Sequence, residues 1–224
     1  MKKQISGMGH QARGTRKNCL LSIVCCLLPV ACCLLPTVCL YAANEIYVTQ
    51  VEKSPLVGGG AVKEIATIVL NNCIKVKEIQ VIKVGGSTSF KYPTYTSKKG
   101  KEFPQFVLLT KQAKDEIEKA VITGKSSANP SKQISYKISK FSKFGRQSSL
   151  KAFCAVDFNN AVRIECKVME SGRGPWVSWP ARKPEEGGKW VKQILITNKK
   201  LKSAVEKALM DKYKPAKSES SEDE

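Results

Sequence analysis

The sequence predicts an α+β fold made of two tandem small domains, each an antiparallel β-sheet with one C-terminal helix, packed together as a pseudo-twofold dimer. Residues 65–80 (IATIVLNNCIKVKEIQ) return as residues 153–167 (FCAVDFNNAVRIECK). Residues 106–122 return as residues 194–210, again 88 positions further along the chain. Solenoid repeats run only ~20–50 residues, so this longer period indicates a duplicated domain. Two copies in one chain can form the twofold pair that a homodimer otherwise supplies.

Two asparagines join the main hairpin of each predicted unit. β-rich runs at 62–70 and 73–84 meet at Asn71-Asn72, and the second unit repeats the pattern around Asn159-Asn160. Asparagine tolerates a positive φ, so a two-residue connection of this kind favours a tight hairpin turn. Aliphatic and charged residues alternate in the strand that follows, which puts a core on one sheet face and charge on the other.

Shorter elements complete each unit. A first strand is predicted at 48–51, and a loop with three glycines at 54–60. A fourth strand ends at Pro93 in the first unit and at Pro180 in the second. A basic loop then leads to a last strand, predicted at about 103–109 and 190–197.

One helix follows each last strand. Thr110 and Asn198 are suitable N-caps, and Gly124 is a suitable stop for the first helix. Apolar residues three or four positions apart give each helix one stripe to bury. The stripes are Ala113, Ile117, Ala120 and Val121 in the first helix, and Leu201, Val205, Ala208 and Leu209 in the second.

The predicted units span residues 44–124 and 134–214. A polar linker, 125–133, joins them. The acidic tail, 215–224, is expected to be disordered because it offers almost no apolar surface to bury.

Residues 1–43 precede the units and are excluded from the fold argument. A basic stretch is followed by a run without charge between Lys17 and Glu45, which includes Tyr41-Ala42-Ala43. This order is typical of a signal peptide, and the run is also long enough for an uncleaved membrane anchor. The near-repeat CCLLPVA–CCLLPTV indicates a third interpretation, translated repetitive DNA ahead of a true start near Ile46. The protein is cytoplasmic under this third interpretation, and exported or membrane-anchored under the other two.

The chain is strongly basic and poor in catalytic side chains. Its net charge is +19, and the five positive residues of 1–43 leave +14 for the remainder. This excess favours nucleic acid as a partner first and an anionic lipid surface second. His10 is the single histidine of the chain and precedes the units, which excludes histidine-based nucleophilic or zinc sites from them. We therefore expect no enzyme, no metal site and no cofactor.

The nine cysteines do not indicate a disulfide framework. Six lie before residue 44, which leaves Cys73, Cys154 and Cys166 in the units. The last two occupy apolar strand positions where the first unit has Ala66 and Ile79. Buried free thiols are therefore favoured over a disulfide.

The second unit carries an ordered set of motifs between residues 162 and 213. Gly172 is followed by WVSWPARK at 176–183, GKW at 188–190 and VEKAL at 205–209. This order resembles the SpoVG family, small bacterial septation and sporulation regulators that bind DNA and RNA. Members of that family are homodimers, so the resemblance implies that this chain is a fused dimer.

The first unit resembles the family less closely. It keeps Tyr92-Pro93, GKEF at 100–103 and IEKAV at 117–121, but no Arg-Lys pair follows the proline directly. The family's His-Pro pair near the last strand is missing from both units, and Leu195-Ile196 stands at its place in the second.

Lysine and arginine contacts to phosphate are the predicted mechanism, with an affinity that falls steeply with salt. Arg182 and Lys183 rank first, because they match the family's basic pair and follow a turn fixed by proline. The other candidates in the second unit are Arg163, Lys167, Arg173, Lys189, Lys192, Lys199 and Lys200. The candidates in the first unit are Lys75, Lys77, Lys98, Lys99, Lys101 and Lys111. Trp176, Trp179 and Trp190 could stack on bases, although packing in the core or between units is the favoured interpretation.

The predicted function is a SpoVG-like nucleic-acid-binding regulator of septation, cell division or gene expression that acts on DNA or RNA. The alternative is an exported or membrane-anchored envelope protein, which uses the same fold as a scaffold and meets the membrane through its N-terminal segment. The two units are expected to pair within one chain, and a higher oligomer stays open.

Overall fold

The structure, a computed structural model, describes residues 45–58, 60–97, 99–127, 133–183 and 188–213. These residues belong to one compact unit, Ala42–Glu224. The predicted N-terminal segment and acidic tail lie outside them, as does the centre of the linker. The described fold consists of antiparallel sheets with two helices, which confirms the predicted α+β class. Neither described helix has the length and apolar character needed to cross a membrane.

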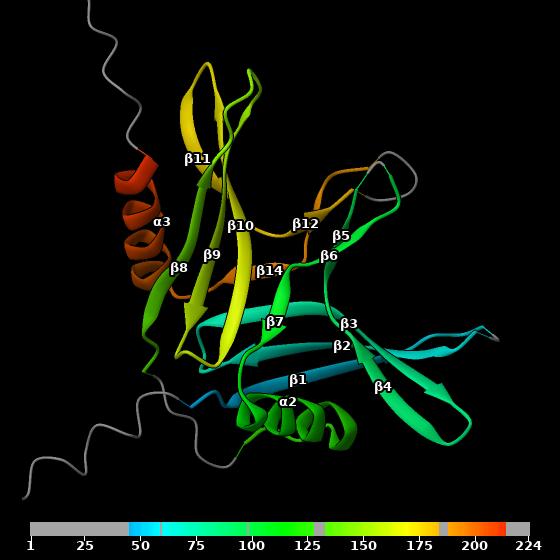
Figure 1. Ribbon diagram of the computed structural model, residues 1–224. Coiled ribbons are helices and arrows are strands. Elements are labelled where there is room, and N and C mark those ends of the chain that lie inside the picture. Colours follow the sequence, from blue (N-terminus) through cyan, green and yellow to red (C-terminus); the bar gives the residue numbers. More distant parts are fainter. Residues whose placement is uncertain (1–44, 59, 98, 128–132, 184–187, 214–224) are drawn as a thin grey trace, which may run out of the picture. The chain divides into compact units, whose positions relative to one another are not determined.

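Two larger sheets organise the described residues (Figure 1). Sheet one has the order β1–β2–β3–β14, and β4 also pairs with β3. Its strands are β1 (Val48–Pro55), β2 (Val62–Leu70), β3 (Ile74–Val84), β4 (Ser87–Lys91) and β14 (Ile194–Ile196). Sheet two has the order β11–β10–β9–β8, and β7 also pairs with β10. Its strands are β7 (Phe106–Leu108), β8 (Tyr136–Lys143), β9 (Leu150–Phe158), β10 (Val162–Ser171) and β11 (Gly174–Ser178).

The predicted last strands lie in unexpected places, because each pairs with a strand of the other repeat. Phe106 of β7 stands opposite Ile164 of β10, and Ile194 of β14 stands opposite Val76 of β3. The flanking backbone hydrogen bonds run from Lys77 N–H to Gln193 O (2.8 Å) and from Glu165 N–H to Gln105 O (3.0 Å). Every residue in these contacts lies 88 positions from its counterpart, so the two exchanges are reciprocal.

The asparagine turns form as predicted. All four residues have a positive φ: 47° and 55° at Asn71 and Asn72, and 49° at both Asn159 and Asn160. Positive φ at both central positions is the signature of a type I′ turn, whose twist suits a two-residue hairpin. The alternation beyond the turns is also confirmed, since Ile74 and Val76 are fully buried while the lysines beside them are only partly covered.

The predicted caps are confirmed for both helices, α2 (Lys111–Thr123) and α3 (Lys199–Tyr213). Thr110 Oγ1 accepts from the backbone of Ala113 at 3.2 Å, and Asn198 Oδ1 accepts from that of Leu201 at 3.1 Å. Gly124 ends α2 with φ 68°, a left-handed conformation that glycine adopts without a Cβ penalty.

The two apolar stripes face one hydrophobic core that draws on both repeats. All four predicted residues of α2 are buried, and in α3 Val205 and Leu209 are buried while Leu201 and Ala208 are partly covered. The three cysteines of the described residues are free and buried in the same core, as predicted. Full burial of one aliphatic side chain stabilises a fold by about 1.5–3 kcal/mol, so this shared core holds the two repeats together.

Two element boundaries differ from the prediction. Strand β1 continues to Pro55, well beyond the predicted end, because it pairs with β2 along its length and places Pro55 opposite Glu64. Each predicted last strand is also interrupted, at Gln105 and at Gln193. The residues before each interruption form a separate small hairpin instead. These hairpins are β5 (Thr94–Thr96) with β6 (Glu102–Pro104), and β12 (Ala181–Arg182) with β13 (Val191–Lys192).

Candidate nucleic-acid interface

The two small hairpins, called arm one (residues 94–104) and arm two (residues 181–192), are closed at their bases by the same bond. Gln105 N–H donates to Pro93 O at 2.9 Å, and Gln193 N–H donates to Pro180 O at 2.9 Å. Proline has no N–H to continue a strand ladder, so the chain leaves the sheet at that point and returns beside it. Both basic loops predicted from the sequence therefore become hairpins of defined register.

Exposed lysines gather on the arms. Arm one presents Lys99 and Lys101, and arm two presents Lys183, Lys189 and Lys192. Within the described part of the chain, none of these five makes an ion pair. The acid described on the arms, Glu102, is paired with Lys91 at 2.8 Å. Predicted residue Lys98 lies outside the described residues.

A cavity of about 240 Å³ brings the bases of the two arms together. Thr94, Thr96 and Glu102 of arm one and Arg182 of arm two line it, with residues of β3 and β4 and of the segments that close the arms. The lining residues from outside the arms are Glu78, Gln80, Lys91, Tyr92, Pro93 and Gln193. The Tyr92 hydroxyl is buried and has no described hydrogen-bond partner, and burial raises the pKa of this group.

Glu78 is a β-bulge residue that reaches into this cavity. Residues 77 and 78 stand opposite Thr67 alone, since the register shifts between Ala66 and Ile68. Glu78 has φ 61°, which is costly for a residue with a side chain. Its carboxylate accepts two hydrogen bonds from Arg182, both 2.7 Å, and one from Gln193 Nε2 at 3.0 Å. The Arg182 guanidinium, and then the Gln193 amide, lower the pKa of Glu78.

Arg182, the first-ranked candidate for a phosphate contact, is thus already paired with the carboxylate of Glu78. Its bidentate pair with Glu78 uses the guanidinium face that was predicted to grip a phosphate. Lys183, the second member of the predicted pair, is exposed and makes no ion pair among the described residues. The geometry therefore favours Lys183 over Arg182 as the phosphate contact of this pair.

Two further candidates also carry ion pairs on the sheets. Arg163 donates to both carboxylate oxygens of Asp157, at 2.6 and 2.9 Å, and Ser139 Oγ donates to the same acid at 2.7 Å. The Arg163 guanidinium holds the pKa of Asp157 below its ordinary value. Lys75 pairs with Glu52 at 3.6 Å. These two cations are partly neutralised before any ligand arrives.

Lys167 and Lys101 lie over aromatic rings. Lys167 Nζ is 4.1 Å from the centre of the Tyr95 ring, and Lys101 Nζ is 5.3 Å from that of Phe103. Lys167 is half-buried, and its burial lowers the pKa of the ammonium group. Two lysines predicted from charge alone are therefore set beside aromatic side chains of arm one.

The remaining candidates are dispersed. Lys199 and Lys200 are exposed in the first turn of α3, and Arg173 is exposed in the turn between β10 and β11. Lys77 is partly covered on β3. These positions lie on different elements from the arms.

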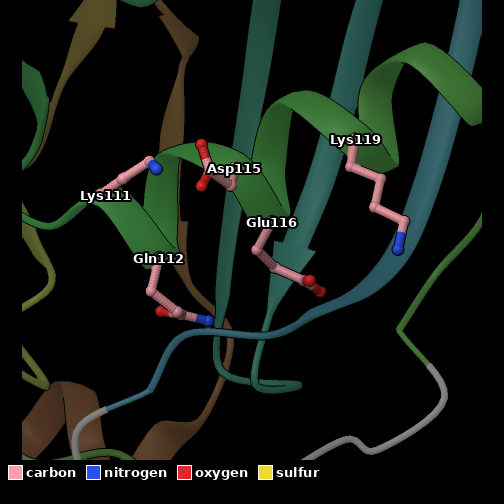
Figure 2. A pocket seen from close by; sticks show the side chains of 5 residues that line it. All are labelled: Lys111, Gln112, Asp115, Glu116 and Lys119. Carbon is pink, nitrogen blue, oxygen red and sulfur yellow. The ribbon is translucent and has the colours of Figure 1, made fainter.

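Lys111 lies at a second hollow, of about 500 Å³, along one side of α2 (Figure 2). Gln112 Nε2 donates to Ile46 O at 2.9 Å, and Glu116 Oε1 accepts from Val48 N–H at 3.2 Å. These two side chains therefore anchor the start of β1. Two acids and two lysines line this hollow, so it offers no net positive site.

The tryptophans divide into one partly buried and two exposed residues. Trp179 packs against the core and donates from Nε1 to Glu206 at 2.8 Å, as predicted. Trp176 and Trp190 are 44% and 67% exposed, so the expectation of packing is wrong for both. Trp176 lies on the face of β11 opposite that of Val177, which packs against the core, and Trp190 directly precedes β13 in arm two.

Comparison with known proteins gives no assignment: no family model, no curated protein and no solved structure matches this chain. Among the described residues, no group of three or more histidine, cysteine or acidic side chains is placed to hold a metal ion.

Sequence reasoning missed the Glu78 bulge and the aromatic residues of arm one. A signal for the bulge was present: the asparagine turns are 88 residues apart, but Pro93 and Pro180 are 87 apart. The first repeat therefore has one extra residue between its turn and its proline. Tyr95 and Phe103 gave no comparable signal, because a single aromatic in a short loop is compatible with burial.

Proposed function

We propose that this chain is a SpoVG-like nucleic-acid-binding protein that holds the phosphate backbone with the lysines of its two arms. The observation that carries the proposal is the set of five exposed arm lysines without an ion pair among the described residues. Cations not already neutralised by acids can replace the counterions of a polyanion, and this exchange drives sequence-independent binding. A role in regulating septation, cell division or gene expression belongs to the same proposal.

We further propose that the repeats act as two tandem domains paired about a pseudo-twofold axis, as a fused dimer. The reciprocal exchange of β7 and β14 supports this, because corresponding residues make corresponding contacts in both directions. An interface that joins like to like is what twofold symmetry requires. The pairing sets the bases of both arms around one cavity, so that a single polyanion can meet both.

The test is a binding measurement with the whole chain and two charge-matched variants. Lys183→Ala/Lys189→Ala/Lys192→Ala removes the arm-two lysines. Labelled duplex DNA and single-stranded RNA serve as probes at low salt. We expect the variant to lose roughly tenfold or more in affinity for both probes, since it gives up as many as three phosphate contacts.

The control removes the same charge elsewhere. Lys119→Ala/Lys125→Ala/Lys212→Ala changes three exposed lysines in or directly after the two helices, which like the arm lysines make no ion pair among the described residues. If binding depends on the arms, this control stays within about threefold of the unaltered chain. Equal losses in the two variants would show a diffuse charge effect and would contradict the proposed interface.

An envelope-associated scaffold is the second candidate function. The uncharged run between Lys17 and Glu45 is the observation that favours it. Its test is sedimentation of the whole chain with neutral and with anionic lipid vesicles. Binding to both kinds of vesicle, without binding to either nucleic acid, would favour the scaffold over the nucleic-acid role.

A further inference from the structure

Six side chains of arm one, sheet two and the start of the β8–β9 turn follow one another through ring contacts and directly opposite strand positions, and are here called the aromatic band. Its members are Lys101, Phe103, Tyr95, Lys167, Phe153 and Phe144. The first half runs along arm one: Lys101 lies over the Phe103 ring, and Phe103 stands directly opposite Tyr95 in the β5–β6 register. Directly opposite residues of an antiparallel pair present their side chains on the same face.

The second half of the band crosses onto sheet two. Lys167 lies over the Tyr95 ring at 4.1 Å and stands directly opposite Phe153 in the β10–β9 register. Phe153 in turn contacts Phe144 edge to face, with ring centres 5.9 Å apart. From arm one to the beginning of the β8–β9 turn, each of the two ammonium groups is therefore followed by two rings.

The aromatic band is exposed, although its residues are of the kind that a core normally buries. Tyr95, Phe103 and Phe153 are 42%, 43% and 39% exposed, whereas Cys154, the next residue after Phe153, is fully buried. Phe153 therefore lies on the face of sheet two that is turned away from the core. A contiguous exposed apolar surface of this kind marks a binding site more often than isolated exposed residues do.

The fold itself does not require these rings. The matching places around sheet one hold Arg182 for Tyr95, Val191 for Phe103, Gln80 for Lys167 and Ile65 for Phe153. The same strands and the same arm thus form there without any of the aromatics. The band therefore forms at only one of the two matching places that the described repeats provide.

We propose that the aromatic band binds single-stranded nucleic acid, RNA or DNA, by stacking unpaired bases on its rings while Lys101 and Lys167 contact phosphates. This assignment rests on the nucleic-acid role proposed above and specifies the form of its ligand. Every base has a π-face, and a single strand can leave that face open to a protein ring, whereas the stacked bases of a duplex cannot. Lys167 is half-buried without an ion pair among the described residues, so an incoming phosphate would supply the missing counter-charge.

The test uses the whole chain and three probes of one sequence: a labelled 12-nucleotide single-stranded DNA, the same RNA, and the DNA duplex. The variants are Tyr95→Ala and Phe153→Ala, with Tyr95→Phe as the variant that keeps the ring. Ile122→Ala is the control, because Ile122 is an apolar side chain 58% exposed on α2, outside both the arms and the aromatic band. Urea unfolding of each variant confirms that it is folded.

We expect each alanine variant to weaken single-strand binding about 5- to 100-fold, the range measured when a stacking ring is removed. Duplex binding changes less than about twofold, and Tyr95→Phe and Ile122→Ala bind both single strands like the unaltered chain. Losses that are equal for duplex and single strand would overturn the band assignment. So would single-strand binding that falls with the arm-two lysine variant but not with Tyr95→Ala or Phe153→Ala, although the proposed function would then stand. Absence of binding to all three probes at low salt would remove the proposed function itself.

Discussion

Asn71 and Asn159 donate from their side-chain amides to the same two backbone carbonyls, those of Glu45 and Gln133. The distances to Glu45 O are 3.4 Å from Asn71 and 2.9 Å from Asn159, and those to Gln133 O are 3.3 and 3.5 Å. Both asparagines are buried, at 0% and 1% exposed. The side-chain oxygen of Asn71 accepts a hydrogen bond from the backbone N–H of Tyr47, and that of Asn159 accepts one from the backbone N–H of Ser135. Tyr47 and Ser135 each lie two residues after one of the two shared carbonyls. The turn residues of the two hairpins therefore also join the repeats.

The replacement of Asn71 by glycine tests whether these shared hydrogen bonds stabilise the fold. Glycine accepts the positive φ of the turn, so Asn71→Gly removes the side-chain hydrogen bonds while the backbone conformation remains accessible. We expect a loss of about 1–3 kcal/mol in the free energy of unfolding, because buried partners lose their hydrogen bonds. Asn72→Gly is the control, since Asn72 has the same kind of φ but an exposed side chain. Urea denaturation measures both variants, and equal losses would show that the turn backbone rather than the shared bonds decides stability.

Phe106 tests the exchanged strand. Its ring is 2% exposed and lies 5.5 Å from the Tyr92 ring, while its backbone pairs with β10 of the other repeat. Phe106→Ala should cost about 3–5 kcal/mol through the cavity that it leaves. Phe103→Ala, three residues earlier and 43% exposed, should change stability by less than about 0.5 kcal/mol. A small cost for Phe106→Ala in urea titrations would mean that β7 adds little to the shared core.

Local structure was predictable from the sequence because local chemistry determines it. Asn71-Asn72 specifies its turn through φ, Thr110 and Asn198 specify helix starts through their side-chain oxygens, and Ile117 belongs to a stripe with a helical period. Each of these signals lies within a few residues, and each is confirmed.

The partners of the last strands were not predictable, because Phe106 and Ile194 fit either sheet equally well. The two sheets have nearly the same sequence pattern, so alternation alone cannot say which of them a short apolar strand joins. For the candidate site, the number of basic residues in the sequence identified the candidate lysines and arginines. It did not show which of them form ion pairs with acidic side chains. Arg182 and Arg163 are paired with Glu78 and Asp157 through contacts that only the folded chain creates.

Asp157 gives a prediction for pH. The Arg163 guanidinium lowers its folded pKa below the ordinary value of 3.8, so near that pH the unfolded chain binds a proton more readily than the folded one. The pair therefore stabilises the fold above about pH 4, and its contribution disappears as the pH falls through the folded pKa. We expect Asp157→Asn to be less stable at pH 6, with a difference from the unaltered chain that shrinks toward pH 3. Urea midpoints across this range measure it, and a difference independent of pH would contradict the assignment.

The pair of Glu78 and Arg182 should be a modest stabilising contact rather than a ligand site. The Arg182 side chain is 47% exposed, and exposed pairs contribute about 0.2–1 kcal/mol. A double-mutant cycle with Glu78→Gln and Arg182→Gln should give a coupling energy near the upper end of that range, because the contact is bidentate. Arg182→Gln should weaken nucleic-acid binding less than Lys183→Gln does. The reverse order would mean that Arg182 leaves Glu78 when a phosphate is present.

The salt dependence of nucleic-acid binding by the whole chain tests the central claim most directly. Each phosphate contact on a single strand contributes about −0.7 to the slope of log affinity against log salt. If all five exposed arm lysines make such contacts, the slope for a single-stranded probe is about −3.5, and the arm-two triple variant brings it to about −1.4. A slope near zero, or one that the triple variant leaves unchanged, would contradict the account.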